Sequence, residues 1–328
     1  MCWRLDYPTY LRAIGLIGNS GYESLLMDRY EYATFLRAQG LRTLEIDGEL
    51  WVMKRPFFLE SIPPHRRIRL TRRGRARLFL HGAAVVRYTC PRGDGSTTCE
   101  YICDDRDYDL HSLGHNARNA TRQGLNNCVV RQVDFDLLAR EGCSINNSVF
   151  DRHDRPGPSH LTRDDLWQRY MRLCSRMQDI DAWGVFVEGR LCGFMLVPII
   201  DDYAYTYHPY VMTESLKYRP MNALLFTVTR HLLATSRVSR VSYGLQPIAF
   251  KSSLEHFKLS MGFRREPIDR NILISPLARP LLSHSTHRAL NYLLRIAPHS
   301  LFLHDWRTFS EALQPEPELA DSPPRAAA

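Results

Sequence analysis

The stretch GLQPIAFKSSLEHFKLSMGF, residues 244–263, decides how the rest of the chain is interpreted. Four of its apolar residues are spaced i, i+4, i+7 and i+11: Phe250, Leu254, Phe257 and Met261. This spacing is typical of one helix face directed at a core. Gly262 then supplies the left-handed residue at which helices commonly end, and Phe263 begins a strand. The stretch therefore predicts a helix that packs on a sheet and is followed directly by a strand.

A polar row runs beside the apolar one in the same helix and consists of Lys251, Glu255 and Lys258. Such a row is usually a solvated ladder of salt bridges, which contributes roughly a few tenths of a kcal/mol per pair. The chain, however, has only four lysines among its 43 basic residues. In a chain so rich in arginine, a lysine marks a place that needs a compact ammonium rather than a planar guanidinium. The residues alone leave both interpretations open.

The composition favours a folded protein with polyanionic partners. The chain has 328 residues, 44% of them hydrophobic, a net charge of +8 and a pI of about 9.1. Its length suggests two domains, and its charge suits a nucleotide cofactor, a nucleotide-sugar, tRNA or an anionic membrane surface. We find neither an apolar run of about 18 residues nor a signal-peptide pattern, so we expect a cytoplasmic protein without a transmembrane segment. The eight cysteines lack zinc-ligand spacing, so we expect small buried residues and no metal.

The order of elements suggests two related halves. Residues 161–276 read as a helix, a β-hairpin, a strand, and then helix, strand, helix, strand, and residues 1–150 contain a weaker copy. Between them, residues 151–160 are polar and hold two prolines and a glycine, which predicts a linker. We expect a helical extension at 277–312 and a disordered, proline-rich tail at 313–328. The sequence thus predicts a mixed α/β (α+β) fold with two domains.

Several local signals add detail. Asp47 with Gly48, and the pair at 188–189, predict tight hairpin turns. Ser112 is expected to cap a helix that ends at Gly124. The densest basic run, HRRIRLTRRGRAR at 65–77, is interpreted as a hairpin loop. That loop either binds a polyanion or is simply solvated.

Three stretches, taken in order, resemble the GNAT acyltransferase superfamily, and more closely its FemAB-like members. They are YDLHSLGHNARNATRQGL at 108–125, YRPMNALL at 218–225 and SLEHFKLSMGF at 253–263. The resemblance implies tandem GNAT-like domains, each a mixed sheet flanked by helices. It also implies transfer of an acyl or aminoacyl group to an amine, with acetyl-CoA or another acyl-CoA as donor. The usual glycine-rich acyl-CoA loop is absent, because residues 216–223 read LKYRPMNA. The long coiled-coil arm of tRNA-dependent relatives is also missing.

The resemblance further implies where a donor would bind. In the family, phosphates bind at the N-terminus of the helix that here begins near Arg219 and Asn222, and Arg219 is the phosphate-binding candidate. Lys258 matches the family's Phe-Lys pair and would hold a donor carbonyl or phosphate as a point charge. Lys251 is the weaker donor-side candidate, and solubility is its other explanation.

Candidates for acid–base chemistry lie in the strand region before that helix. Tyr203, Tyr205 and Tyr207 alternate onto one sheet face, and Tyr205 is included among the catalytic candidates. His208 points to the other face and would be a base near neutral pH. Glu214 follows the strand and would deprotonate an incoming ammonium. Ordinary sheet packing for the tyrosines, and a core or surface position for the other two, are the competing interpretations.

Two functional hypotheses follow. The first is an acyltransferase that acts on a small-molecule or nucleotide-linked substrate in a cleft between the domains. The second is a GNAT-like module without activity that binds a polyanion such as tRNA, a nucleotide-sugar or an anionic membrane surface.

Overall fold

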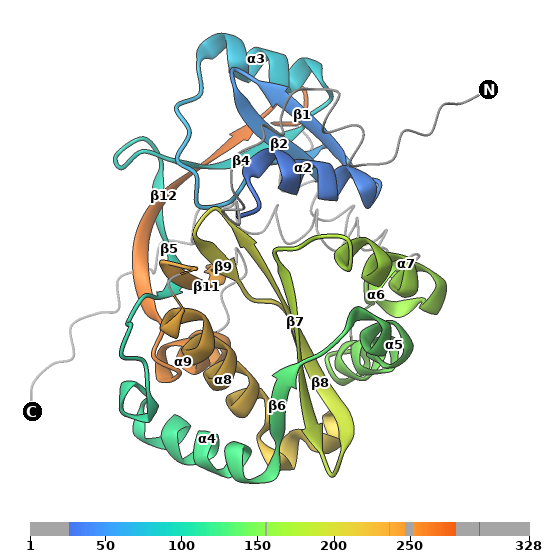
Figure 1. Ribbon diagram of the computed structural model, residues 1–328. Coiled ribbons are helices and arrows are strands. Elements are labelled where there is room, and N and C mark those ends of the chain that lie inside the picture. The colour runs from blue at the N-terminus through green and yellow to red at the C-terminus, as the bar shows by residue number, and fades with distance from the viewer. Residues whose placement is uncertain (1–25, 155, 236, 247–251, 280–294, 296–328) are drawn as a thin grey trace, which may run out of the picture.

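A single twelve-stranded mixed sheet dominates the fold (Figure 1). The structure is a computed structural model, and it describes residues 26–154, 156–235, 237–246, 252–279 and 295. The strands are β1 (Arg42–Ile46), β2 (Glu49–Arg55), β3 (Phe58–Ile62), β4 (Val85–Cys90), β5 (Ser96–Cys103), β6 (Val129–Gln132), β7 (Ile180–Val187), β8 (Arg190–Ile200), β9 (Tyr203–Tyr205), β10 (Tyr207–Val211), β11 (Arg240–Leu245) and β12 (Arg264–Ile274). The α-helices are α2 (Arg29–Ala38), α3 (Arg72–Leu80), α4 (His115–Asn127), α5 (Phe135–Arg152), α6 (Ser159–Thr162), α7 (Asp164–Cys174), α8 (Pro220–Ala234) and α9 (Ser252–Ser260). Two 3-10 turns, η1 (Leu110–Ser112) and η2 (Thr213–Tyr218), precede α4 and α8.

The strand order interleaves the two halves of the chain. It runs β1-β2-β3-β4-β12-β5-β11-β9-β8-β7-β6, and β10 pairs with β8. The last strand, β12, lies antiparallel between β4 and β5, and β6 pairs with β7. Residues on both sides of 151–160 therefore belong to one sheet. Within that segment α5 ends and α6 begins, and both helices pack with α7. The domain boundary at 151–160 stays a prediction.

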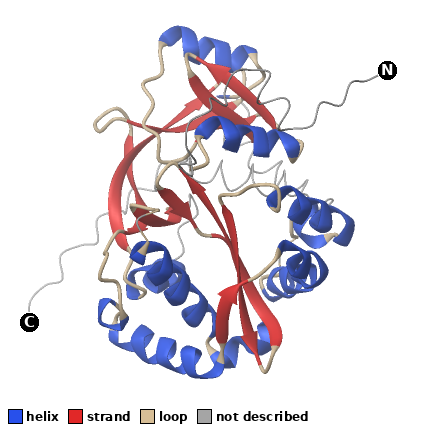
Figure 2. Ribbon diagram, in the orientation of Figure 1, coloured by secondary structure: helices blue, strands red, loops and turns tan. Residues whose placement is uncertain are grey.

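Helices cover both faces of the sheet (Figures 1 and 2). Figure 1 shows α4, α8 and α9 on one side of β6, β7 and β8, and α5, α6 and α7 on the other. One apolar core lies under α8, whose sequence is hydrophobic almost all round, as suits a helix buried between sheet and helices. A second core lies under α2, α5 and α7, and a third joins α3 to β1–β4. The mixed α/β fold class is confirmed.

The predicted turns are confirmed. Asp47 and Gly48 join β1 to β2 with φ of 55° and 75°, and Glu188 and Gly189 join β7 to β8 with φ of 50° and 79°. Positive φ at both central residues is the hairpin geometry that Asp-Gly sequences favour. The seven cysteines that the structure describes are all buried and free, as expected for small core residues.

Three local predictions are wrong. Ser112 does not cap α4, because it lies in η1 and the N-cap of α4 is Gly114. The basic run at 65–77 does not form a hairpin loop, because residues from Arg72 onward form α3, which Thr71 caps through a 2.9 Å hydrogen bond from the Gly74 N–H. Gly124 lies inside α4 instead of ending it. A Cβ at Gly124 would come within 2.6 Å of the Arg219 carbonyl oxygen, so this glycine allows α4 to approach the start of α8 closely.

Candidate active site

The centre of the sheet opens where β9 ends. β9 runs parallel to β11, and the last pair in their register is Tyr205 with Ser242. The chain then continues into β10, which pairs with β8 instead. His208 has a φ of +52°, and the register of β10 shifts between Tyr207 and Tyr210. A bulge of this kind bends a strand away from its neighbour, so β10 and β11 diverge beyond the Tyr205–Ser242 pair.

Lys258 is buried beside this opening. Its Nζ lies 4.1 Å from the ring centroid of Tyr101 on β5 and 4.9 Å from that of Tyr243 on β11. The residue is only 4% exposed. Burial lowers the pKa of Lys258 to about 8, although the carboxylate of Glu255 opposes this shift. The electron-rich ring faces stabilise the ammonium that the loss of water would otherwise disfavour.

Glu255 completes this cluster from one turn earlier in α9. One carboxylate oxygen accepts a 2.7 Å hydrogen bond from the Tyr101 hydroxyl and a 2.8 Å bond from Arg265 Nε. These bonds, first the one from Arg265 and then the one from Tyr101, lower the pKa of the Glu255 carboxyl. The carboxylate therefore fixes the ring over which Lys258 lies.

The predicted faces of α9 are partly reversed. Glu255 and Lys258 face inward, whereas Leu254 of the predicted apolar stripe is 39% exposed. The interpretation as a solvated ladder is wrong for these two polar residues. Lys251 and Phe250 lie outside the described residues.

The opposite face of the same strands carries a second polar group. Glu100 is buried and accepts a hydrogen bond from the Ser242 hydroxyl. Burial raises the pKa of Glu100, and the bond from Ser242 only partly offsets this effect. Arg240, also on β11, lies over the Tyr203 ring at 5.1 Å. A carboxylate and an ammonium are thus buried on the two faces of β5 and β11.

Tyr205 belongs to the Glu100 face. Its hydroxyl is hydrogen bonded to His65 Nδ1, and the His65 ring stacks on Tyr203 with 4.2 Å between centroids. The other His65 nitrogen, Nε2, is 3.5 Å from an Asp201 carboxylate oxygen. The sequence placed Tyr205 and Lys258 in one catalytic set, but the structure places them on opposite faces of the sheet.

His208 is enclosed by aromatic rings. Its Nε2 is 3.4 Å from the Tyr170 hydroxyl, and its ring packs near those of Tyr207 and Tyr210. Burial lowers the pKa of His208 to about 4. A general base works best when its pKa lies near the working pH, so this environment does not suit the predicted base role at neutral pH. The left-handed backbone of His208 instead marks the bulge in β10.

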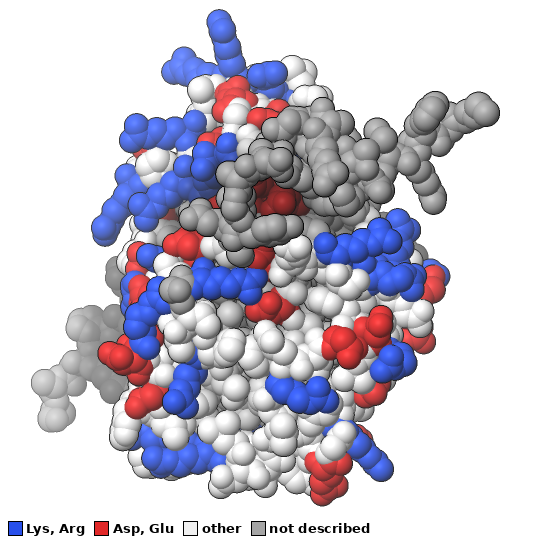
Figure 3. Space-filling model, viewed as in Figure 1, with Lys and Arg blue, Asp and Glu red and all other residues white. Residues whose placement is uncertain are grey.

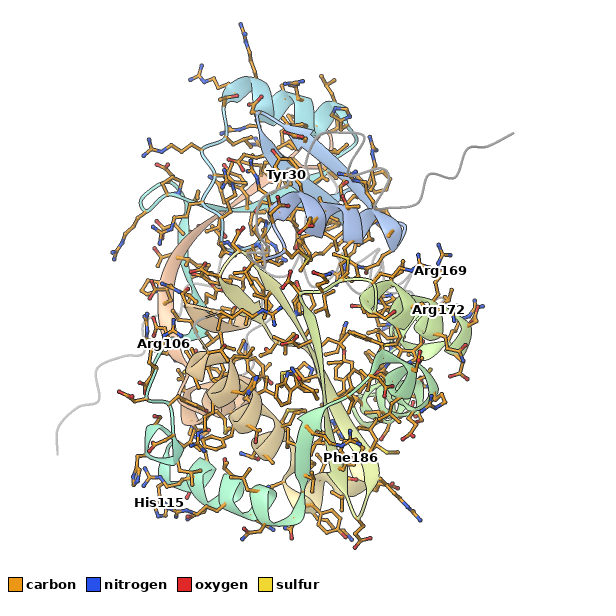
Figure 4. All side chains as sticks on the ribbon, in the orientation of Figure 1. Tyr30, Arg106, His115, Arg169, Arg172 and Phe186 are labelled. Carbon is orange, nitrogen blue, oxygen red and sulfur yellow. The ribbon has the colours of Figure 1, made fainter. Side chains whose placement is uncertain are left out.

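Glu214 has different neighbours again. It is exposed on η2 and lines a cavity of about 710 Å³ with residues of α5 and of the β7–β8 hairpin. Arg131 also lines this cavity, with its guanidinium 4.3 Å from the ring centroid of Phe186, which Figure 4 labels. Lys258 contacts β5 and β11 rather than these elements, so the structure does not bring Glu214 together with it.

The start of α8 is where the sequence places a donor phosphate. Arg219 is exposed and left-handed, with φ 58° and ψ 39°, and Pro220 occupies the first turn. The Asn222 amide donates to Met261 Sδ at 3.4 Å, which turns this side chain toward the end of α9. Arg219 is thus the exposed basic side chain at the start of α8, whereas one N–H of the Asn222 amide is already engaged by Met261.

Sequence reasoning missed four polar groups of the two faces: His65, Glu100, Tyr101 and Tyr243. One signal was available for Glu100, because it is the only charged residue in the otherwise uncharged strand STTCEYIC at 96–103. A carboxylate in such a strand is rarely placed in a core without a partner. The tyrosines gave no local signal, since aromatic residues are common in strands.

The described part of the chain contains no group of three or more His, Cys, Asp or Glu side chains arranged to hold a metal ion. No helix there is both long enough and apolar enough to cross a membrane.

Comparisons with known proteins place the fold. No family model matches the sequence, and no curated protein matches it either. Among solved structures, the chain is similar to the C-terminal domain of a proposed lysylphosphatidylglycerol synthetase from Agrobacterium fabrum, with a TM-score of 0.53 and 10% identity over 77% of this chain and 90% of that one. It is also similar to FemX, with a TM-score of 0.52 and 10% identity over 76% of this chain and 92% of that one. The chain therefore shares the fold of these two proteins, and the predicted GNAT-like fold is confirmed.

Proposed function

We propose that the protein is an N-acyltransferase, which moves an acyl or aminoacyl group from an activated donor to an amine acceptor. Acetyl-CoA or another acyl-CoA is the donor class that we favour. The observation that carries the proposal is the ammonium of Lys258, buried between the rings of Tyr101 and Tyr243 next to the split between β10 and β11. A buried cation at a strand split suits a reaction in which negative charge develops.

In this reaction the acceptor nitrogen attacks the carbonyl carbon of the donor. A C–N bond forms, the bond from carbon to the donor sulfur or oxygen breaks, and the proton lost by the amine leaves with solvent or with the departing group. Lys258 would stabilise the negative charge on the carbonyl oxygen or on the leaving group as a point charge. At the other end of the donor, Arg219 and the first N–H groups of α8 would bind phosphate.

Steady-state transfer from radiolabelled acyl-CoA and from aminoacyl-tRNA to amine acceptors tests the proposal. We expect Lys258→Met to lower turnover at least about tenfold, which corresponds to roughly 1.4 kcal/mol of barrier. Methionine keeps an unbranched apolar stem, so the packing against both tyrosines should survive. The melting temperature of the variant should barely move.

Lys251→Met is the matched control, because it removes the other lysine of the same stretch, one heptad earlier. It should leave turnover nearly unchanged. If Lys258→Met retains wild-type turnover with every donor that the wild type accepts, Lys258 is a structural cation and the proposal fails. A wild-type protein that binds a donor but transfers nothing would instead be the silent binding module.

A further inference from the structure

One end of the sheet exposes an unusual group of large apolar side chains. Phe57 is 53% exposed, Leu80 85% and Leu277 89%. They come from the β2–β3 turn, the end of α3 and the segment after β12. Backbone hydrogen bonds join the three segments: the Ala84 N–H donates to the Phe57 carbonyl and the Ala84 carbonyl accepts from the Ser275 N–H, each at 2.8 Å. Leu80 precedes Ala84 by four residues, and Leu277 follows Ser275 by two. The hydrogen bonds therefore hold the three segments that carry these exposed side chains next to one another.

An apolar groove adjoins this end and is flanked by arginines. The groove has a volume of about 280 Å³ and is lined by Phe79 and residues 272–274 of β12. Arg75 of α3 and Arg279 stand at its sides, and both are exposed. A ligand that fits such a groove combines an anionic group with an apolar chain.

Further arginines surround the apolar end. Exposed arginines lie at positions 67, 69, 72, 73, 75 and 77, in and just before α3. Figure 3 shows Lys and Arg side chains gathered over α3 at the top of the molecule. The positive charge and the protruding apolar residues thus occupy the same end.

We propose that this end, made of Phe57, Leu80, Leu277, Arg75 and Arg279, docks on an anionic phospholipid membrane surface. The arginines would bind headgroup phosphates, and the three apolar side chains would enter the boundary between headgroups and acyl chains. A nucleic acid fits less well, because leucines offer no ring for a base to stack on. A second copy of the same end also fits poorly, since it would bring two groups of arginines together.

The docking end and the proposed active site lie at opposite ends of one strand. β12 begins at Arg264, next to Arg265, which holds Glu255, and it ends at Ile274 beside the groove. An eleven-residue strand spans at most roughly 35 Å. Docking at one end therefore leaves the split between β10 and β11 away from the lipid surface. The inference does not depend on the proposed transfer activity.

Co-sedimentation of the full chain with vesicles tests the inference. The vesicles are phosphatidylcholine alone or phosphatidylcholine with phosphatidylglycerol, and we expect binding only to the second kind. The double variant Leu80→Ser/Leu277→Ser should lower the partition coefficient at least about tenfold, because it removes apolar side chains that enter the membrane. Both positions are exposed, so folding should be unaffected, which a thermal melt checks.

The arginine pair Arg75→Gln/Arg279→Gln should weaken binding about twenty-five-fold, because each arginine near an anionic surface contributes roughly fivefold. The control pair Arg169→Gln/Arg172→Gln removes the same charge from α7, at positions labelled in Figure 4. Val129→Ser controls for the loss of an exposed apolar residue, since Val129 is 63% exposed on β6. Neither control should change binding by more than about twofold.

The inference is overturned if Arg169→Gln/Arg172→Gln weakens binding as much as Arg75→Gln/Arg279→Gln, because net charge alone would then account for binding. It is equally overturned if Val129→Ser weakens binding as much as Leu80→Ser/Leu277→Ser. It is also overturned if the wild type does not sediment with anionic vesicles. Binding to labelled tRNA that depends on Leu80 and Leu277 would assign the surface to nucleic acid and equally overturn it.

Discussion

Neighbouring residues on β5 and β11 give the two faces of the central sheet opposite characters. Glu100 and Ser242 point to one face, where a buried carboxylate accepts a hydrogen bond from a hydroxyl. Tyr101 and Tyr243, the next residues along, point to the other, where their rings enclose the ammonium of Lys258. Alternation along a strand is enough to separate the acid from the cation, because successive side chains leave opposite sides.

Burial shifts the pKa of the buried group on each face, but in opposite directions. Burial raises the pKa of Glu100 and lowers the pKa of Lys258 to about 8. In both cases the loss of water disfavours the charged form. The comparison teaches that each face keeps its group closer to neutrality than it would be in water. The start of α8, the proposed phosphate site, is linked to the end of α9 on the Lys258 face, because the Asn222 amide there donates to Met261 Sδ.

The largest expected effect concerns the charge state of Lys258. If its ammonium supports transfer, turnover should fall about tenfold per pH unit above the pKa of Lys258, near 8. The Lys258→Arg variant stays charged throughout this range. Its residual activity should therefore lack the alkaline fall. The acceptor amine titrates equally in both proteins, so the ratio of their turnover numbers from pH 7 to pH 10 isolates Lys258. A constant ratio would remove the charge of Lys258 from the mechanism.

A smaller effect concerns stability on the Glu100 face. The folded pKa of Glu100 is raised above its ordinary value of 4.5. The stability linked to its neutral form is therefore complete below pH 4.5 and is lost as the pH rises through the folded pKa. Glu100→Gln cannot lose a proton and keeps an acceptor for the Ser242 hydroxyl. Relative to wild type, the variant should gain stability as the pH rises from 4 to 7, measured by urea unfolding.

Lys258 should behave in the opposite way in the same experiment. Its folded pKa lies below the ordinary value of 10.5. The wild type should therefore gain stability relative to Lys258→Met as the pH rises from about 8 toward 10.5. If the stability of Glu100→Gln and of Lys258→Met, each relative to wild type, changed with pH in the same direction, the contrast between the two faces would be wrong.

Short-range chemistry explains what the sequence predicted well. The turns at Asp47-Gly48 and Glu188-Gly189 depend on residues that tolerate positive φ, and this preference is local. The helix–glycine–strand order at 252–274 is local in the same way, and Gly262 has the expected φ of 83°. These features needed no knowledge of distant parts of the chain.

Long-range packing explains what the sequence could not predict. The periodic pattern predicts that Leu254 is buried against the core and that Lys258 is exposed to solvent. The structure shows the reverse. The reason is that Tyr101 reaches this helix from a strand about 150 positions earlier and accepts a cation where an apolar residue would be expected. Likewise, nothing near β12 indicates that it lies between β4 and β5. The candidate site thus depends on contacts between residues far apart in the sequence, which the periodicity of a single segment does not predict.

The smallest expected effect concerns His208, which lies on β10 where this strand diverges from β11. Because burial lowers the pKa of His208 to about 4, its ring should contribute little as a base near pH 7. Its backbone, with φ of +52°, is the feature that the bulge requires. His208→Asn keeps a residue that tolerates the left-handed region, so turnover should stay within about twofold of wild type.

His208→Val separates the backbone role from the chemical one. A β-branched residue disfavours this conformation, so we expect the free energy of unfolding to fall by roughly 1–2 kcal/mol. Urea unfolding and steady-state turnover, measured on both variants, distinguish the two roles. If His208→Asn instead loses turnover tenfold while it remains as stable as wild type, the imidazole takes part in the chemistry. The split between β10 and β11 would then have a base, His208, on β10 in addition to the Lys258 cation, which lies over the Tyr243 ring of β11.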